Sequence, residues 1–284
     1  MHLLAFDTST DALSVAVMRR TSTGPLYWQH QGAGGAAASG SLIAAVMDLL
    51  RQADLRLQDL DAICFGSGPG SFTGLRTACS VAQGLAFGAG VPVLPVPSLL
   101  ALAQSARAAH APLADQGRIS ALLDARMDQV YAATYAFATD VWTTVQTPCL
   151  LAPEQVAAWS QAVPAQDSAA SLAPGAQANL AWRAWAGNVF GSYGERLAAP
   201  AGLLCCDVLP QAMAILQVAP ALMAAGACVA PEQALPLYVR DKVAKTTGER
   251  ALEKAAKAGI AHSEAALADA SVPPSAAHAP TAGT

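Results

Sequence analysis

The sequence of 284 residues lacks several things that common active sites require, and lysine is the first of them. No lysine precedes Lys242, so the chain holds no G-x-x-x-x-G-K-[ST] loop, in which a lysine contacts the nucleotide phosphates. The six cysteines show no C-x-x-C spacing, and the five histidines form no H-E-x-x-H or H-x-x-x-H pair. No G-x-S-x-G motif surrounds Ser71. The absence of these motifs excludes a Walker loop, a histidine or cysteine metal site and a serine-hydrolase site.

Long hydrophobic runs and strong charge are also missing. The chain is 54% hydrophobic, yet no run is long enough to span a bilayer, and residues 3–6 are typical of a strand rather than a signal peptide. The net charge of −4 gives no nucleic-acid footprint. The basic cluster at 240–257 is more typical of a solvated tail than of an RNA contact. We expect a reduced, cytoplasmic protein that contacts no membrane.

The most informative stretch is FGSGPGSFTGLRTACSVAQGLAFGAG at 65–90. A buried strand ends at Phe65, a glycine-rich turn follows, and a helix is predicted over 72–87 with Ser71 as its N-cap. The third glycine of a G-x-G-x-x-G fingerprint would come one residue early here, so a tight turn is favoured over a phosphate site. Because two glycines flank Pro69, we predict a positive φ at Gly68 or Gly70.

The predicted helix carries a row of small residues. Gly74, Ala78, Ala82 and Ala86 follow one another at i+4 spacing, so they share one face and allow another backbone to come close. Large apolar residues flank the row. A helix that is apolar nearly all round must be covered on more than one side, so we expect an exposed apolar patch for a partner.

Asp7 is the first candidate for chemistry, because it ends a strand and begins the polar turn DTSTD. Actin-like ATPases place such a turn against phosphates and a metal, whereas an Asx-turn would satisfy local N–H groups, and both interpretations stay open. The pattern of strand, acidic turn and strand recurs at 119–137, which predicts a duplicated unit. At the second turn, Asp124, Arg126 and Asp128 are either a catalytic group or, as we favour, a neutralised surface turn.

Four segments, in this order, resemble the TsaB (YeaZ) family: LLAFDTSTDALSVAV, FGSGPGSFTGLRTACSVAQGLA, LLDARMDQVYAATY and ALPLYVRDKVA. The resemblance covers about residues 1–243. It implies an α/β, actin-like and Hsp70-like ATPase (ASKHA) fold with two lobes, each a mixed β-sheet flanked by helices. We expect the N-terminal, partner-binding lobe at 1–107 and the C-terminal lobe at 108–243. The tail at 244–284 is rich in Ala and Pro, and its composition predicts disorder. Residues 162–178 are predicted as a loop rich in Pro, Ala and Ser. Residues 210–225 are predicted as a helix and 235–238 as a last strand.

The resemblance also implies a function. Family members are non-catalytic scaffold or dimerisation subunits of the complex that forms N6-threonylcarbamoyladenosine at position 37 of tRNAs. For this chain the resemblance therefore implies no cofactor and no catalytic residue. Their partner is the catalytic subunit TsaD, bound through helices that correspond here to 41–51 and 72–87, and TsaE joins the larger complex. Alone, the protein is expected to form a homodimer, and it would contact tRNA only through the complex. The predicted partner interface consists of Leu42, Val46, Leu49, Leu50, Gly74, Leu75, Ala78 and Ala82.

The alternative is an ATP-binding enzyme of the actin-like class that uses Asp7 and the glycine turn at 66–74. In the favoured hypothesis the same region is only a vestigial nucleotide site. Its residues would be Asp7, Thr8, Ser9, Gly68 and Gly70.

Overall fold

The computed structural model describes residues 1–35, 38–110, 116–138, 141–162 and 183–240. Met1–Val239 make up one compact unit, and of the residues that follow only Arg240 is described. The predicted tail at 244–284, and all of the predicted loop at 162–178 except its first residue, lie outside the described residues.

The first sheet has five strands in the order β3-β2-β1-β4-β5. They are β1 (His2–Asp7), β2 (Ala12–Thr21), β3 (Gly24–Ala33), β4 (Ala62–Gly68) and β5 (Val93–Pro97). β1, β2 and β3 pair antiparallel, and β4 and β5 continue the sheet in parallel with β1.

The second sheet repeats this arrangement, with the order β10-β9-β6-β7-β8. Its strands are β6 (Gln116–Asp124), β7 (Val130–Ala138), β8 (Val141–Leu151), β9 (Arg183–Gly187) and β10 (Leu204–Asp207). Three antiparallel strands are again followed by two parallel ones. The predicted duplication is therefore confirmed at the level of topology.

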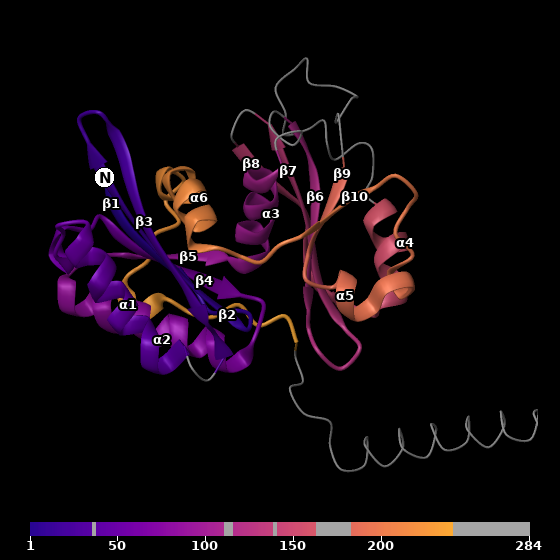
Figure 1. The fold of residues 1–284 in the computed structure, drawn as a ribbon, viewed down its shortest axis with the longest axis horizontal. Helices are drawn as coiled ribbons and strands as arrows, with labels where there is room; N and C mark the ends of the chain where they lie inside the picture. The colour runs from indigo at the N-terminus through magenta and orange to yellow at the C-terminus, as the bar shows by residue number, and fades with distance from the viewer. Residues whose placement is uncertain (36–37, 111–115, 139–140, 163–182, 241–284) are drawn as a thin grey trace, which may run out of the picture. The chain divides into compact units, whose positions relative to one another are not determined.

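Helices cover both faces of each sheet (Figure 1). α1 (Ala38–Gln52) and α2 (Phe72–Ala89) pack on one face of the first sheet, and α6 (Ala212–Ala224) packs on the other. α3 (Ser98–Ala109) contacts both α6 and the second sheet, and α4 (Val156–Gln161) and α5 (Phe190–Tyr193) follow along the chain. Short 3-10 helices are η2 (Leu57–Asp59), η4 (Pro153–Gln155), η5 (Gly194–Leu197) and η6 (Pro231–Gln233).

The four central residues of β1, Leu3 to Phe6, are all apolar, and the packing shows why. Leu4 and Phe6 point into the cluster beneath α1 and α2, whereas Leu3 and Ala5 point into the cluster beneath α6. A strand covered on both faces needs no polar alternation. α6 belongs to the later half of the sequence but packs on the first sheet. No single boundary in the sequence therefore separates the two sheets together with the helices that cover them. The lobe boundaries at 107 and 243 stay a prediction.

Local signals set the ends of α2. The Ser71 hydroxyl accepts a hydrogen bond from the Gly74 N–H at 3.4 Å, and Gly90 ends the helix in the left-handed region at φ 70°. The predicted strand, glycine turn and capped helix are confirmed. The predicted positive φ occurs at Gly68, with φ 114°.

Candidate functional site

The turn after β1 is organised by the buried carboxylate of Asp7. Its Oδ1 accepts hydrogen bonds from the Ser9 N–H at 2.8 Å and the Ser9 hydroxyl at 2.6 Å. Its Oδ2 accepts one from the Ser98 hydroxyl at 2.9 Å, and the same hydroxyl accepts from the Gly68 N–H at 3.2 Å. Burial raises the pKa of Asp7 above its ordinary value of 3.8, although the bonds from Ser9 and Ser98 act in the opposite direction.

The glycine turn packs directly against this acidic turn. A Cβ at Gly66 would overlap the Asp7 carboxylate, and one at Gly74 would overlap the Thr8 carbonyl. A Cβ at Gly70 would also be too close to the Ser9 backbone. The Thr8 hydroxyl donates to the Gly74 carbonyl at 2.7 Å across the same contact. Close packing against the Asp7 side chain and against the Thr8 and Ser9 backbone therefore explains these three glycines without a ligand.

The structure thus brings together the five residues predicted for a nucleotide site, but the Asp7 carboxylate, the Thr8 hydroxyl and the Gly68 N–H all have hydrogen-bond partners within the chain. Both Asp7 oxygens accept hydrogen bonds from the chain itself, which is what the Asx-turn interpretation requires. The vestigial nucleotide site stays a prediction. Among the described residues, no group of three or more His, Cys, Asp or Glu is placed to hold a metal ion.

The second acidic turn carries surface ion pairs. Arg126 lies 2.6 Å from Asp11 of the first turn and 3.6 Å from Asp124, and Asp128 pairs with Arg196 at 3.1 Å. The Tyr193 hydroxyl donates to Asp124 at 2.7 Å. This geometry agrees with the neutralised surface turn rather than with a catalytic group.

The eight residues predicted for the partner interface are buried within the chain itself. They do not form an exposed patch, so this prediction is wrong. They are Leu42, Val46, Leu49, Leu50, Gly74, Leu75, Ala78 and Ala82. The small row of α2 lies against β4, and Ala78, Ala82 and Ala86 belong to the core beneath the helix. Small side chains allow close approach to a sheet as readily as to a partner, and here the sheet takes that face.

Other apolar side chains on the same two helices are exposed. Ile43 and Met47 of α1 are 47% and 49% exposed, and Phe72 and Phe87 of α2 are 39% and 81% exposed. The periodicity identified the apolar stripe of each helix correctly, but we interpreted that stripe as the partner interface, whereas it packs on the chain's own sheet. Large apolar residues that fall outside a helix's own core stripe were the signal available in the sequence.

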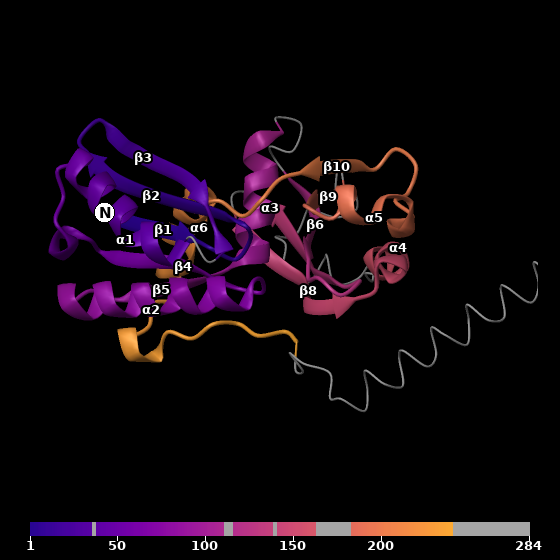
Figure 2. The ribbon, with the colours of Figure 1, turned by 60° about the horizontal axis from the view of Figure 1, so that its bottom comes forward.

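A C-terminal segment, residues 230–239, lies along α2 (Figure 2). The Ala234 carbonyl accepts hydrogen bonds from Cys79 and from Gln83, the latter at 3.0 Å, and the Leu237 N–H donates to the Ser67 carbonyl at 2.7 Å. The segment begins with η6, and its residues 235–238 form no strand, contrary to the prediction.

An aromatic and cationic group fixes the end of this segment at the start of α2. The Phe72 and Tyr238 rings lie 5.7 Å apart, the Arg76 guanidinium stacks 3.8 Å from the Phe72 centroid, and the Arg76 Nε–H donates to the Tyr238 hydroxyl at 3.2 Å. Sequence analysis missed these three residues, because Tyr238 reaches α2 from 162 residues away.

Two five-stranded mixed sheets with the same strand order, each flanked by helices, define a two-lobed α/β protein of the actin-like and Hsp70-like ATPase class. A family model described as "TsaD: tRNA N6-adenosine threonylcarbamoyltransferase" matches residues 36–219. The tRNA threonylcarbamoyladenosine biosynthesis protein TsaB of Escherichia coli is 32% identical over 86% of this chain and 96% of its own length. The Haemophilus influenzae TsaB is 40% identical over 46% of this chain and 52% of its own.

A solved structure of YeaZ from Pseudomonas aeruginosa superposes with a TM-score of 0.68 at 36% identity. It covers 84% of this chain and 99% of that protein. The chain belongs to the TsaB (YeaZ) family. In the described part of the chain, no helix is both long enough and apolar enough to cross a membrane.

Proposed function

We propose that this chain is a non-catalytic scaffold subunit in the formation of N6-threonylcarbamoyladenosine at position 37 of tRNAs. Its relatives are named as threonylcarbamoyladenosine biosynthesis proteins, and it shares a family model with the transferase TsaD. In this proposal TsaD binds α1 and α2, TsaE joins the pair, and tRNA is contacted through the complex in the cytoplasm. Without TsaD, the same helices pair with a second copy.

The observation that carries this proposal is the outer surface of the two helices. α1 and α2 contact each other, and each exposes two large apolar side chains. Exposed apolar side chains gathered on neighbouring elements are a common mark of a protein interface. The residues concerned are Ile43, Met47, Phe72 and Phe87, and we call them the outer helix residues.

The outer side of α2 also has a small-residue row of its own. Ser80, Gly84 and Gly88 follow at i+4 spacing, and all three are exposed. A Cβ built at Gly84 or Gly88 would meet nothing within 4 Å. Glycine costs about 1 kcal/mol in a helix interior compared with alanine, so two glycines with free space around them need another explanation. Close approach of a partner helix supplies one.

The interior of the Asp7 turn supports the non-catalytic part of the proposal. Both carboxylate oxygens are engaged by Ser9 and Ser98, and the glycine turn fills the space beside them. Titration of the isolated protein with ATP and magnesium should therefore show weak or no binding. Tight binding that Asp7→Ala removes would instead favour an ATP-binding enzyme.

The interface is tested by Gly84→Arg, matched with Ala221→Arg on the exposed side of α6. Because Gly84 has open space and arginine is a good helix former, the first variant should fold at least as well as wild type. The variant should no longer co-purify with TsaD, and threonylcarbamoyl transfer should be slower when it replaces the wild-type chain in the complete reaction. Reactions that omit each subunit in turn serve as controls. Ala221→Arg should bind normally. Unchanged TsaD binding by folded Gly84→Arg would place the interface elsewhere.

A further inference from the structure

The second sheet carries a cavity of about 390 Å³ on the face opposite α3. Arg118 and Ser120 of β6 line it, together with Arg183 and Trp185 of β9, and α4 contributes Ser160 and Gln161. Pro200 and Leu203, which precede β10, complete the wall. Its volume falls at the lower end of the range for small-molecule sites.

One end of this cavity is strongly cationic. Arg118 and Arg183 are register partners on neighbouring parallel strands, and none of the eight lining residues is acidic. Arg118 is only 7% exposed, and among the described residues its Nε has no hydrogen-bond partner. Burial lowers the pKa of Arg118, and the nearby charge of Arg183 lowers it further. Among the eight lining residues Arg118 therefore has no counter-charge, and a buried guanidinium without one is costly.

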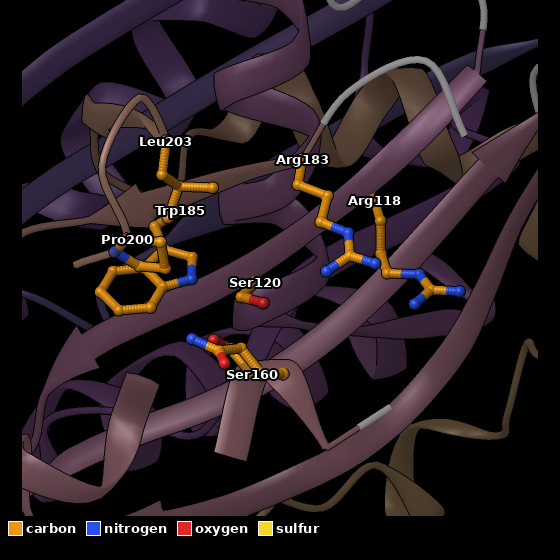
Figure 3. Close-up of a pocket in the computed structure, with 8 residues that line it drawn as sticks. Arg118, Ser120, Ser160, Arg183, Trp185, Pro200 and Leu203 are labelled. Atoms are coloured by element: carbon orange, nitrogen blue, oxygen red, sulfur yellow. The ribbon is translucent and has the colours of Figure 1, made fainter. Parts of the chain in front are cut away.

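The other end is apolar. Figure 3 shows Trp185, Pro200 and Leu203 grouped together, with the two arginines across the cavity and Ser120 between them. Trp185 is 2% exposed, so its indole is held firmly in the wall. The cavity therefore offers a cationic end and a flat apolar end to a single ligand.

Hydrogen bonds hold the floor of the cavity in place. The hydroxyls of Ser120 and Thr134 lie 3.0 Å apart, and the Thr134 hydroxyl donates to Gln146 at 2.7 Å. The Gln146 side-chain amide donates to the Trp159 carbonyl at 3.1 Å, which fixes α4 above the sheet. A site that is formed before its ligand arrives loses less free energy to ordering.

We propose that this cavity binds a small organic anion, whose phosphate or carboxylate group pairs with Arg118 and Arg183 and whose aromatic or apolar part lies against Trp185. Guanidinium groups form paired hydrogen bonds with both kinds of oxyanion. This site lies on the second sheet and does not involve α1 or α2, so it stands independently of the proposed scaffold function.

Calorimetric titration of the full chain tests this with phenyl phosphate, benzoate, inorganic phosphate and the neutral analogue phenol. Phenyl phosphate or benzoate should bind more tightly than inorganic phosphate, and phenol should not bind. Comparing the first two separates a phosphate from a carboxylate preference. If neither organic anion binds at millimolar concentration, or if phenol binds equally well, the proposal is overturned.

Variants locate the binding. Arg118→Gln and Arg183→Gln should each weaken binding at least about tenfold, the effect of losing one charged hydrogen bond. Arg20→Gln removes the same charge from an exposed position on β2 and should leave the affinity unchanged. Trp185→Leu should weaken binding of phenyl phosphate but not of inorganic phosphate.

Thermal stability without ligand distinguishes a binding role from a structural one. Arg118→Gln should melt at or above the wild-type temperature, because it removes a buried charge that has no counter-charge among the residues that line the cavity. A lower melting temperature together with unchanged ligand affinity would mean that Arg118 only supports the fold. Should that variant fail to fold, the exposed Arg183 still tests the site, and unchanged affinity in Arg183→Gln would overturn the proposal.

Discussion

Two glycines on α2 are chemically identical but lie in opposite surroundings. Gly74 faces the first turn, where an added methyl group would overlap the Thr8 carbonyl, and Gly84 faces open space. Gly74→Ala should destabilise the protein by about 1–3 kcal/mol through overpacking. Gly84→Ala should stabilise it by about 0.4–1 kcal/mol, because alanine has less conformational freedom to lose on folding. Urea denaturation of both variants measures the difference, and equal effects would contradict the packing at Gly74.

Asp7 makes a pH-dependent prediction. Burial raises its pKa in the folded state above the ordinary 3.8, so the folded protein holds this proton more tightly than the unfolded chain does. Below pH 3.8 both states are protonated and the group makes no difference. As the pH rises through 3.8 toward the folded pKa, the unfolded chain ionises first and the wild type loses stability. Relative to wild type, Asp7→Asn should therefore gain stability across that window.

The measurement is the free energy of unfolding of both proteins between pH 4 and pH 8. The asparagine oxygen can still accept from Ser9, and its amide can donate toward Ser98, so the fold should persist. A difference that does not change with pH, or that moves in favour of wild type as pH rises, would mean that Asp7 is ionised and stabilised by its three hydrogen bonds.

Residue-level predictions succeeded where the signal was local. The Ser71 cap and the positive φ near Pro69 depend on neighbours in sequence, and the structure confirms both. The contact between Asp7 and Ser98 spans 91 positions, and no local pattern indicates it. Likewise, Arg118 is surrounded by residues of β9 and α4, and the sequence of β6 alone does not indicate that these elements lie beside it.

At the scale of elements, α2 shows what periodicity does not determine. The helix has two small rows, one at Gly74, Ala78 and Ala82 and one at Ser80, Gly84 and Gly88. Either row permits close approach, and only the structure shows that the first contacts the sheet. The rule that an all-apolar helix is covered on several sides predicts a second covered face, and coverage of the outer row by a partner stays a prediction. The rule does not say which face the chain's own sheet covers.

A substitution in the buried row tests this assignment. Ala78 is fully buried in the core beneath α2, so Ala78→Arg would place an unpaired charge there as well as overfilling it. The loss should exceed about 4 kcal/mol and unfold the first lobe. Gly84→Arg, six residues along the same helix, adds the same side chain on the open side. Circular dichroism and thermal melting of the two should therefore diverge, and a well-folded Ala78→Arg protein would contradict the burial.

For the whole molecule, the duplication was the easiest feature to predict, because each half shows a strand, an acidic turn and a returning strand in sequence. The return of α6 to the first sheet was harder, since its residues 212–224 come after both sheets have begun. The two acidic turns also meet through Arg126 and Asp11, a contact between halves that neither half indicates by itself.

The last prediction concerns the association of whole chains. If α1 and α2 pair two copies when TsaD is absent, Phe87 is the side chain most affected, because it is 81% exposed at the end of α2. Phe87→Ser should weaken self-association without lowering the melting temperature, whereas Val141→Ser, which removes a 58% exposed apolar side chain from β8, should leave association unchanged. Analytical ultracentrifugation over a range of concentrations measures this. Since a stable interface buries about 1,600 Å² in total, TsaD and a second copy should compete for the same helices, so adding TsaD should dissociate the homodimer. A complex in which α1 and α2 bind a second copy of this chain and a TsaD molecule at the same time would contradict the shared surface.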